Sequence, residues 1–235
     1  MDLDEYNLFL PLSDSEENNS LHQLLPFVSE KKQEKIKRFR FDIDRKLSLY
    51  SELMVRVIAS QTLKIPNREI VFGSGEWGKP KIEGHPEFHY NISHTRNAVM
   101  VAIADGSVGA DIEKIKEAEY GIAKRFFTAR EQEYIVESDE GAAERFYEVW
   151  TRKEAYCKYL GKGLSLPLNT FDVTGPLLCA SIVTGNWGEY IWSVCARQPD
   201  MHFAVQEWTQ GQVERMALSS LRKYELKNMT FREND

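Results

Sequence analysis

The sequence predicts an α+β fold of two similar lobes, each a small antiparallel sheet with packed helices. Two long segments, 47–63 and 142–160, carry apolar residues at helical spacing, and short segments of alternating apolar and polar residues lie between and after them. Each half runs from a segment rich in Arg and Phe to a longer helix and then to strands. We therefore expect a pseudo-duplication, with an N-terminal lobe at 1–106 and a C-terminal lobe at 107–235.

The composition is that of an ordinary globular protein and argues against several classes of function. The 235 residues are 42% hydrophobic and 28% charged, with a net charge of −6, which disfavours nucleic-acid binding because phosphate contacts need a basic surface. We find neither a signal peptide nor an apolar run long enough to span a membrane. Cys157, Cys179 and Cys195 are scattered and lack metal-ligand spacing. We expect a cytoplasmic protein with reduced thiols and no membrane association.

The first lobe is expected to begin with a strand and two helices. Residues 6–12 read as a short strand and 13–20 as a polar loop, Ser29 begins a helical stretch, and the helix at 47–63 ends at Pro66. A dense cationic run comprises Lys31, Lys32, Lys35, Lys37, Arg38, Arg40, Arg45 and Lys46. Such a run is either a solvated helix face or an anion site whose Arg and Lys side chains meet phosphates.

Three short strands are expected before the middle of the chain. They cover 70–72, 88–93 and 98–104, and a Gly-rich loop at 73–80 carries Lys79.

The Asp-Gly dipeptide at 105–106 is a hairpin signal that sets the expected register of the next strand. It pairs 98–104 with 108–113, so that Asp111 and Glu113 point together to one face, above small residues. The opposite, core face would consist of Val99, Val101, Ile103, Val108, Ala110 and Ile112.

The same register brings Ser93 and His94 close to Asp111 and Glu113, because the turn at 93–97 lies at the end toward which the carboxylates run. Two carboxylates, a hydroxyl and an imidazole make a poor core. They suit a hard cation such as Mg²⁺ together with a phosphorylated ligand. The sequence therefore predicts a site here.

The second lobe is expected to be helical first and to end in strands. Residues 128–131 form a capping box that opens a helix, and the helix at 142–160 stops at Gly161. The later expected elements are a loop with a short strand at 164–173, a hairpin of 190–196 with 203–208, and a loose charged segment from 212 onward.

Charged residues interrupt the apolar stripe of the helix at 142–160. Lys153 lies in the middle of the stripe, where an unpaired ammonium would be costly, so we expect it to reach a carboxylate or a backbone carbonyl. Glu154 lies at the edge of the stripe, with Lys158 one turn further on. The alternative is a lysine that snorkels beside a surface Glu–Lys pair.

Four stretches of the chain fall into one family pattern. They are Gly78-Lys79-Pro80, Asn91-Ile92-Ser93-His94, Val108-Gly109-Ala110-Asp111-Ile112-Glu113, and Trp150-x-x-Lys153-Glu154-Ala155-x-x-Lys158 with Gly161-Lys162-Gly163-Leu164. Phe126-Phe127-Thr128 with Glu131 also matches. In this order the stretches resemble the 4′-phosphopantetheinyl transferases, specifically the two-lobed type that activates surfactin synthetase.

The resemblance implies transfer of the 4′-phosphopantetheine arm of coenzyme A to a serine of an apo carrier protein, with release of adenosine 3′,5′-bisphosphate. Coenzyme A would bind between the lobes, with Mg²⁺ on its pyrophosphate. The carrier would be an acyl, peptidyl or aryl carrier, as in nonribosomal peptide and antibiotic biosynthesis. Two lobes in one chain make a monomer sufficient.

The resemblance also implies roles for residues at the matching positions. The expected metal ligands are Asp111, Glu113 and Glu154. The expected catalytic residues are Glu154, Lys158 and His94, with Glu154, or a metal-bound water beside it, as the general base. The expected contacts to coenzyme A are Lys32, Lys35, Arg45, Lys79, Pro80, Ser93, His94 and Lys158.

Two other interpretations stay open at this point. Another Mg²⁺-dependent phosphotransferase or a nucleotide hydrolase could use the same carboxylates, although the glycines at 73, 75 and 78 do not precede a GK[ST] signature. A non-catalytic carrier-binding module could retain the fold.

Overall fold

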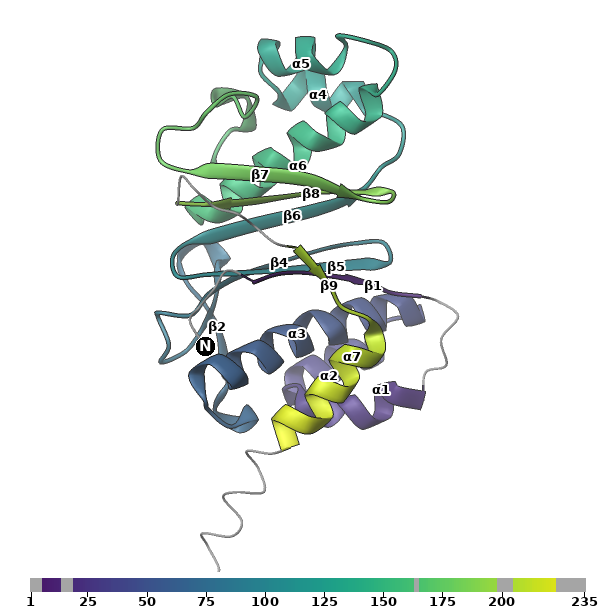
Figure 1. Ribbon diagram of the computed structural model, residues 1–235, viewed down its shortest axis with the longest axis vertical. Coiled ribbons are helices and arrows are strands. Elements are labelled where there is room, and N and C mark those ends of the chain that lie inside the picture. The colour runs from purple at the N-terminus through teal and green to yellow at the C-terminus, as the bar shows by residue number, and fades with distance from the viewer. Residues whose placement is uncertain (1–5, 14–18, 163–164, 198–204, 223–235) are drawn as a thin grey trace, which may run out of the picture.

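The computed structural model describes residues 6–13, 19–162, 165–197 and 205–222, which form two stacked lobes with helices on the outer faces (Figure 1). The N-terminal lobe contains β1 (Tyr6–Pro11), α1 (Asn19–Leu24), α2 (Glu30–Arg38), α3 (Asp42–Leu63), β2 (Phe72–Ser74), β3 (Pro80–Ile82), β4 (His89–Thr95) and β5 (Ala98–Ala104). The C-terminal lobe contains β6 (Val108–Lys114), α4 (Tyr120–Phe126), α5 (Ala129–Ile135), α6 (Ala142–Leu160), β7 (Ser181–Trp187) and β8 (Tyr190–Ala196). The described chain ends with β9 (Val205–Glu207), α7 (Gln210–Met216) and a π-helical turn at Ala217–Leu221. Short 3₁₀ turns cover Leu25–Phe27, Asn67–Glu69, Glu76–Gly78 and Leu168–Thr170.

Two sheets meet in the middle of the molecule. One has the strand order β4-β5-β1-β9 and the other β6-β8-β7, while β2 and β3 form a separate two-stranded sheet. All pairings are antiparallel except the one between β1 and β9. The predicted α+β class, with small sheets and packed helices, is confirmed.

The predicted hairpin between 98–104 and 108–113 is wrong. Strand β5 pairs with β4 on one side and β1 on the other, so neither of its edges is left for β6, which pairs with β8. The Asp-Gly turn instead carries the chain from one sheet to the other. As a result the predicted core face is also wrong, because the residues of β6 pack on the other side of β5. The inter-sheet cluster includes Ala98, Met100, Ala102, Ala104, Val108, Ala110 and Ile112.

One long helix lies on each sheet. In the first lobe α3 packs on β5 and is flanked by α2 and α7. In the second lobe α6 packs across β6 and β8, with α5 against it. A Cβ on Gly109 would lie 2.0 Å from the Ala155 carbonyl oxygen, so glycine is required for α6 to approach β6 this closely.

The C-terminal elements cross back to the first lobe, as Figure 1 shows for β9 and α7. Val213, Ala217 and Leu221 are fully buried in the core of that lobe, so the expected loose segment is wrong for residues 212–222. The predicted hairpin of 190–196 with 203–208 is also wrong, because β8 pairs with β7 and β6, while β9 pairs with β1. The lobe boundary at residue 106 stays a prediction.

Three further expectations meet the limits of the described chain. Gly163, Leu164, 203–204 and 223–235 lie outside the described residues. Over 165–173 the chain forms a 3₁₀ turn where a short strand was expected. None of the helices that the structure describes has the length and apolarity to cross a membrane.

Candidate active site

The candidate site lies where α6 crosses β6 and β6 meets β4. Lys158 Nζ donates to Asp111 Oδ1 at 2.6 Å, to the Ala110 carbonyl at 3.0 Å and to Ser93 Oγ at 3.2 Å. Ser93 Oγ in turn donates to Asp111 Oδ1 at 2.8 Å. Helix α6, strand β6 and strand β4 of the other lobe thus meet at the Asp111 carboxylate.

Side chains of β4 join the two sheets at this point. Asn91 Oδ1 accepts from the Ala110 amide at 3.0 Å, and Ser93 Oγ accepts from the Ile112 amide at 3.4 Å. Next along the strand, Thr95 Oγ1 donates to Glu113 Oε2 at 3.1 Å. The alternation of β4 aims every second side chain at the free edge of β6. Ser93 was predicted to belong to the site, whereas Asn91 and Thr95 were not, although both share its face of the strand.

The carboxylates of the site influence one another. Burial, and then the negative charge of Asp111, raises the pKa of Glu113. The same two causes, in the same order, raise the pKa of Glu154, and the Lys158 ammonium opposes them. Glu113 and Glu154 are therefore partly desolvated and lie within reach of the negative charge of Asp111.

The donor set suits a hard cation. Asp111 Oδ2 is buried and has no hydrogen-bond partner among the described residues, and an unsatisfied buried carboxylate oxygen is costly. Carboxylate oxygens are the ligands that Mg²⁺ prefers. Within the described residues no three His, Cys, Asp or Glu side chains stand close enough to hold a metal as they are. Asp111, Glu113 and Glu154 as metal ligands therefore remain a prediction.

A cationic groove lies beside this site, between α2, α3 and β4. It has a volume of about 320 Å³ and is lined by Lys32, Lys35, Phe39, Asp44, Leu47, Ser48, Ser51, Ile92 and His94. Burial lowers the pKa of Lys32. Burial, followed by the charges of Lys158, Lys32 and Lys35, lowers the pKa of His94, so its imidazole stays neutral at pH 7. A bound anion would relieve this crowding of positive charge.

Ser48 and Ser51 line the groove but were not predicted. Both lie on α3, where helical spacing from Asp44 and Leu47 could have indicated a shared face.

Arg45 is not brought to this groove. Its guanidinium donates to the Phe39 carbonyl at 3.0 Å and to Asp42 Oδ1 at 2.7 Å. Its predicted contact to coenzyme A remains a prediction.

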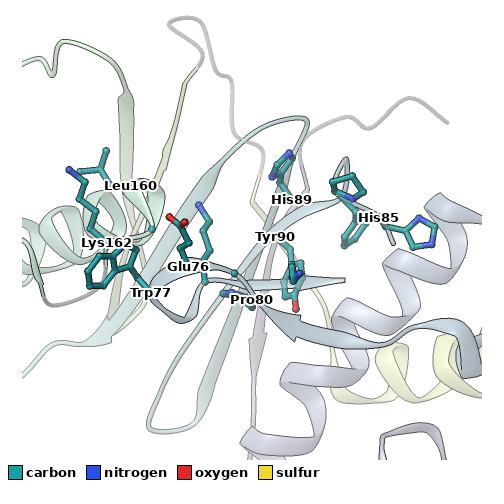
Figure 2. Close-up of a pocket in the computed structure, with 14 residues that line it drawn as sticks. Glu76, Trp77, Pro80, His85, His89, Tyr90, Leu160 and Lys162 are labelled. Carbon is teal, nitrogen blue, oxygen red and sulfur yellow. The ribbon is translucent and has the colours of Figure 1, made fainter. Parts of the chain in front are cut away.

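Lys79 and Pro80 line a second groove, of about 440 Å³ (Figure 2). Figure 2 shows its walls, which come from the loop before β3, from β4 and from the end of α6; the labelled residues are Glu76, Trp77, Pro80, His85, His89, Tyr90, Leu160 and Lys162. The groove therefore borders both lobes. Lys79 Nζ donates to Ser107 Oγ and, at 2.9 Å, to the Tyr159 carbonyl.

Lys153 lies away from these grooves and is fully buried. Its ammonium lies 2.8 Å from Glu131 Oε2 and donates to the carbonyls of Leu168 at 2.6 Å and Phe171 at 2.7 Å. The expectation that Lys153 reaches a carboxylate or a carbonyl is confirmed. Its partner Glu131 was predicted as part of a capping box and of the family pattern, but not as the partner of Lys153.

Comparison with known proteins identifies the same family along most of the chain. The family model described as 4′-phosphopantetheinyl transferase, N-terminal, matches residues 15–105, and the model of the 4′-phosphopantetheinyl transferase superfamily matches residues 107–213. The 4′-phosphopantetheinyl transferase psf-1 of Bacillus pumilus is 39% identical, over 68% of this chain and 70% of the relative. The 4′-phosphopantetheinyl transferase Sfp of Bacillus subtilis (strain 168) is 36% identical, over 72% and 75%. The 4′-phosphopantetheinyl transferase gsp of Aneurinibacillus migulanus is 37% identical, over 70% and 69%.

These matches cover both lobes and include every residue of the candidate site. The chain therefore belongs to the 4′-phosphopantetheinyl transferase superfamily.

Proposed function

We propose that this phosphopantetheinyl transferase moves the 4′-phosphopantetheine arm of coenzyme A to a serine of an apo carrier protein, in a Mg²⁺-dependent reaction centred on Asp111. The observation that carries the proposal is the meeting of Lys158, Ser93 and Asp111 beside a cationic groove. A basic group, a carboxylate with an unsatisfied oxygen and a cationic groove are parts that phosphoryl transfer can use.

Asp111, Glu113 and Glu154 are the residues we propose to hold Mg²⁺, directly or through water. The unpartnered Asp111 Oδ2 and the pKa values of Glu113 and Glu154, raised by burial and then by the charge of Asp111, support this assignment. A divalent cation would satisfy the free oxygen and stabilise both carboxylates in their charged form. Bound there, Mg²⁺ supplies neutralisation of charge at the pyrophosphate oxygens.

Coenzyme A would place its phosphates against lysines of both lobes and the neutral imidazole of His94. We assign Lys32, Lys35 and His94 to the nucleotide phosphates, since they line one groove, and Lys158 with Ser93 to the transferring phosphate. Lys79 and Pro80, which line the second groove, are the proposed contacts to the adenosine side. To contact a phosphate, Arg45 would first have to leave Asp42.

The carrier brings the nucleophile, so no covalent intermediate on this protein is needed. The carrier serine oxygen forms a bond to the β-phosphorus as the pyrophosphate P–O bond breaks, and adenosine 3′,5′-bisphosphate leaves. We assign the serine proton to Glu154, or to a metal-bound water beside it, because Glu154 lies one helical turn before Lys158, which contacts Asp111. We further propose acyl, peptidyl or aryl carriers as substrates, a monomeric state and a cytoplasmic location.

Mass spectrometry of an apo carrier incubated with the protein, coenzyme A and Mg²⁺ tests the proposal. We expect a gain of about 340 Da on one serine, the mass of the transferred arm. The carrier with that serine changed to alanine is the matched control, and EDTA should stop the reaction if Mg²⁺ is required. Binding of ATP without binding of coenzyme A would instead favour another phosphotransferase or a nucleotide hydrolase. Binding of the carrier with no mass gain would indicate a non-catalytic module.

A further inference from the structure

A three-part contact joins the lobes at the C-terminal end of α6. Lys79 comes from the loop before β3, Ser107 from the turn between β5 and β6, and Tyr159 from the last turn of α6. Lys79 Nζ donates to Ser107 Oγ and to the Tyr159 carbonyl at 2.9 Å, and Ser107 Oγ donates to the same carbonyl at 2.7 Å. Two side chains thus close on one backbone oxygen.

The Tyr159 carbonyl belongs to the end of a helix, where carbonyls lack intrahelical partners. Helix α6 ends at Gly161, whose φ of 65° is in the left-handed region and whose amide donates to the Lys158 carbonyl. A cation beside such an end is stabilised by the helix dipole. Lys79 therefore caps, from one lobe, a helix that belongs to the other.

The contact is partly buried, and the lysine stem packs closely against the helix end. A Cβ on Gly161 would lie 3.2 Å from Lys79 Cδ. Burial lowers the pKa of Lys79 to about 8. Among the described residues no carboxylate forms an ion pair with Lys79, which leaves the helix end as the partner of its charge.

The same helix turn carries the side chains of the candidate site. Lys158 directly precedes Tyr159 and reaches Asp111 and Ser93, and Glu154 lies one turn before Lys158. Any slide or fraying of the last turn would move the Lys158 ammonium relative to Asp111. A side chain that holds the Tyr159 carbonyl therefore controls where Lys158 stands.

We propose that Lys79 and Ser107 form an inter-lobe latch on the Tyr159 carbonyl, and that the latch positions Lys158 for the transfer reaction. Ser107 is then a positioning residue that acts through α6, and Lys79 has this role in addition to any contact with coenzyme A. The inference rests on the proposed transferase function for its effect on rate, whereas the latch itself is a structural statement that can be tested without turnover.

Ser107→Ala is the decisive variant, because it removes one arm of the latch and leaves all proposed ligand contacts in place. We expect kcat to fall roughly 3- to 10-fold, the effect of one hydrogen bond, with the KM for coenzyme A unchanged within about twofold. Ser107→Thr, which keeps the hydroxyl, should restore kcat. Ser219→Ala is the matched control, since Ser219 Oγ donates to the Met216 carbonyl at 3.2 Å, far along the chain in α7 and the following turn.

A double-mutant cycle tests whether the two arms act as one latch. Lys79→Met should lower kcat more than Ser107→Ala does, and adding Ser107→Ala to Lys79→Met should cost little more, because both arms hold the same oxygen. Independent, multiplicative effects would overturn the latch.

Amide hydrogen exchange gives a readout that does not depend on turnover. We expect faster exchange of the Gly161 amide and of its neighbours in the last turn of α6 in Ser107→Ala and Lys79→Met, and no change in Ser219→Ala. Wild-type kcat and unchanged exchange in Ser107→Ala would overturn the proposal, as would a change confined to the KM for coenzyme A. If the wild-type protein modified no carrier, the proposed function would fail, while the exchange rates would still decide whether the latch exists.

Discussion

Helix α6 carries two lysine ion pairs of opposite character. At Lys153 and Glu131 both side chains are 0% exposed, and every polar contact is closed within the protein. Glu131 also accepts from the amides of Thr128 at 2.8 Å and Val173 at 2.9 Å. At Lys158 and Asp111 the lysine side chain is 28% exposed, and Asp111 keeps one oxygen without a partner.

The difference indicates that the Lys153 pair is structural and that the Lys158 pair belongs to a binding site. The Lys153 pair ties α5, α6 and the segment around Leu168 and Phe171 together, and it has no unused donor or acceptor to offer a ligand. The Lys158 pair is open to water on one side and has an acceptor to spare. One pair is therefore expected to govern stability and the other to govern chemistry.

The largest expected effect is that of Asp111→Ala on transfer. We expect activity to fall at least about 10³-fold, because the proposed metal site loses its central carboxylate. The melting temperature should change little, because relief of the repulsion that helps to raise the pKa of Glu113 and Glu154 offsets the loss of the pair with Lys158. Carrier modification and thermal denaturation measure the two effects.

Glu189→Gln is the control for charge, because Glu189 pairs with Lys114 at 2.8 Å on the surface. Near-wild-type turnover in Asp111→Ala would show that Asp111 is not part of the active site.

The next effect is on stability and concerns the closed pair. Lys153→Met should lower the free energy of unfolding by about 3–5 kcal/mol, because it leaves the Glu131 carboxylate buried without its cation. Adding Glu131→Gln should recover most of the loss. Lys158→Met should cost less, because the Lys158 side chain is 28% exposed and water can reach the Asp111 carboxylate once the lysine is gone. Urea unfolding measures all three.

Lys153→Met should also lower activity by roughly 10- to 100-fold, because Glu154 is the next residue and would be displaced. Full activity in this variant would show that the closed pair has no influence on the site. Equal losses of stability in Lys153→Met and Lys158→Met would abolish the distinction between the pairs.

A smaller effect is expected on the choice between coenzyme A and its 3′-dephospho form. Lys35→Ala should lose a preference worth roughly 1.5–3 kcal/mol, since Lys35 lines the cationic groove. Arg45→Ala should lose less, because the guanidinium is bound to Asp42. The ratio of kcat/KM for coenzyme A to that for its 3′-dephospho form measures the preference in each variant. A ratio unchanged in both variants would make the cationic run a solvated helix face.

The smallest expected effect is on the reactivity of the cysteines, which reports on the packing of α6 and does not involve the transfer rate. Burial raises the pKa of Cys157 to about 11 and of Cys195 to about 12, whereas Cys179 is exposed. At pH 8 we expect iodoacetamide to label Cys179 alone. Cys157 lies on α6 between the two pairs, so it should become reactive in Lys153→Met and stay protected in Asp111→Ala. Mass spectrometry of the labelled protein would show a second label in the native state if this view of α6 is wrong.

Much of the second lobe could be predicted because its signals are local. Helix α6 spans 142–160 as expected, and both bonds of the capping box between Thr128 and Glu131 are present. Periodicity and caps depend on residues three and four apart, which the sequence displays directly. The misplaced Lys153 likewise signalled a buried partner, although its spacing could not say which.

Strand pairing could not be predicted in the same way. Both faces of β5 are buried, so its pattern does not show which strands lie beside it, and the Asp-Gly turn favoured a neighbour that the sheet had no free edge to accept. The expectation that Ser93 lies beside Asp111 nevertheless agrees with the structure, for a different reason. The two residues meet because side chains of β4 reach the free edge of β6, not because the two strands belong to one meander.

By itself the sequence determined the α+β class, helix α6 with its ends, the capping box at 128–131 and the family motifs, because each depends on neighbours along the chain. Only the tertiary structure decided that β9 and α7 return to the first lobe, that Arg45 is held by Asp42, and that Lys79 and Ser107 close on Tyr159. These contacts join residues far apart in the chain or choose between competing partners. Which partner a strand edge or a charged side chain takes depends on what the rest of the fold leaves unoccupied, and no local pattern records that.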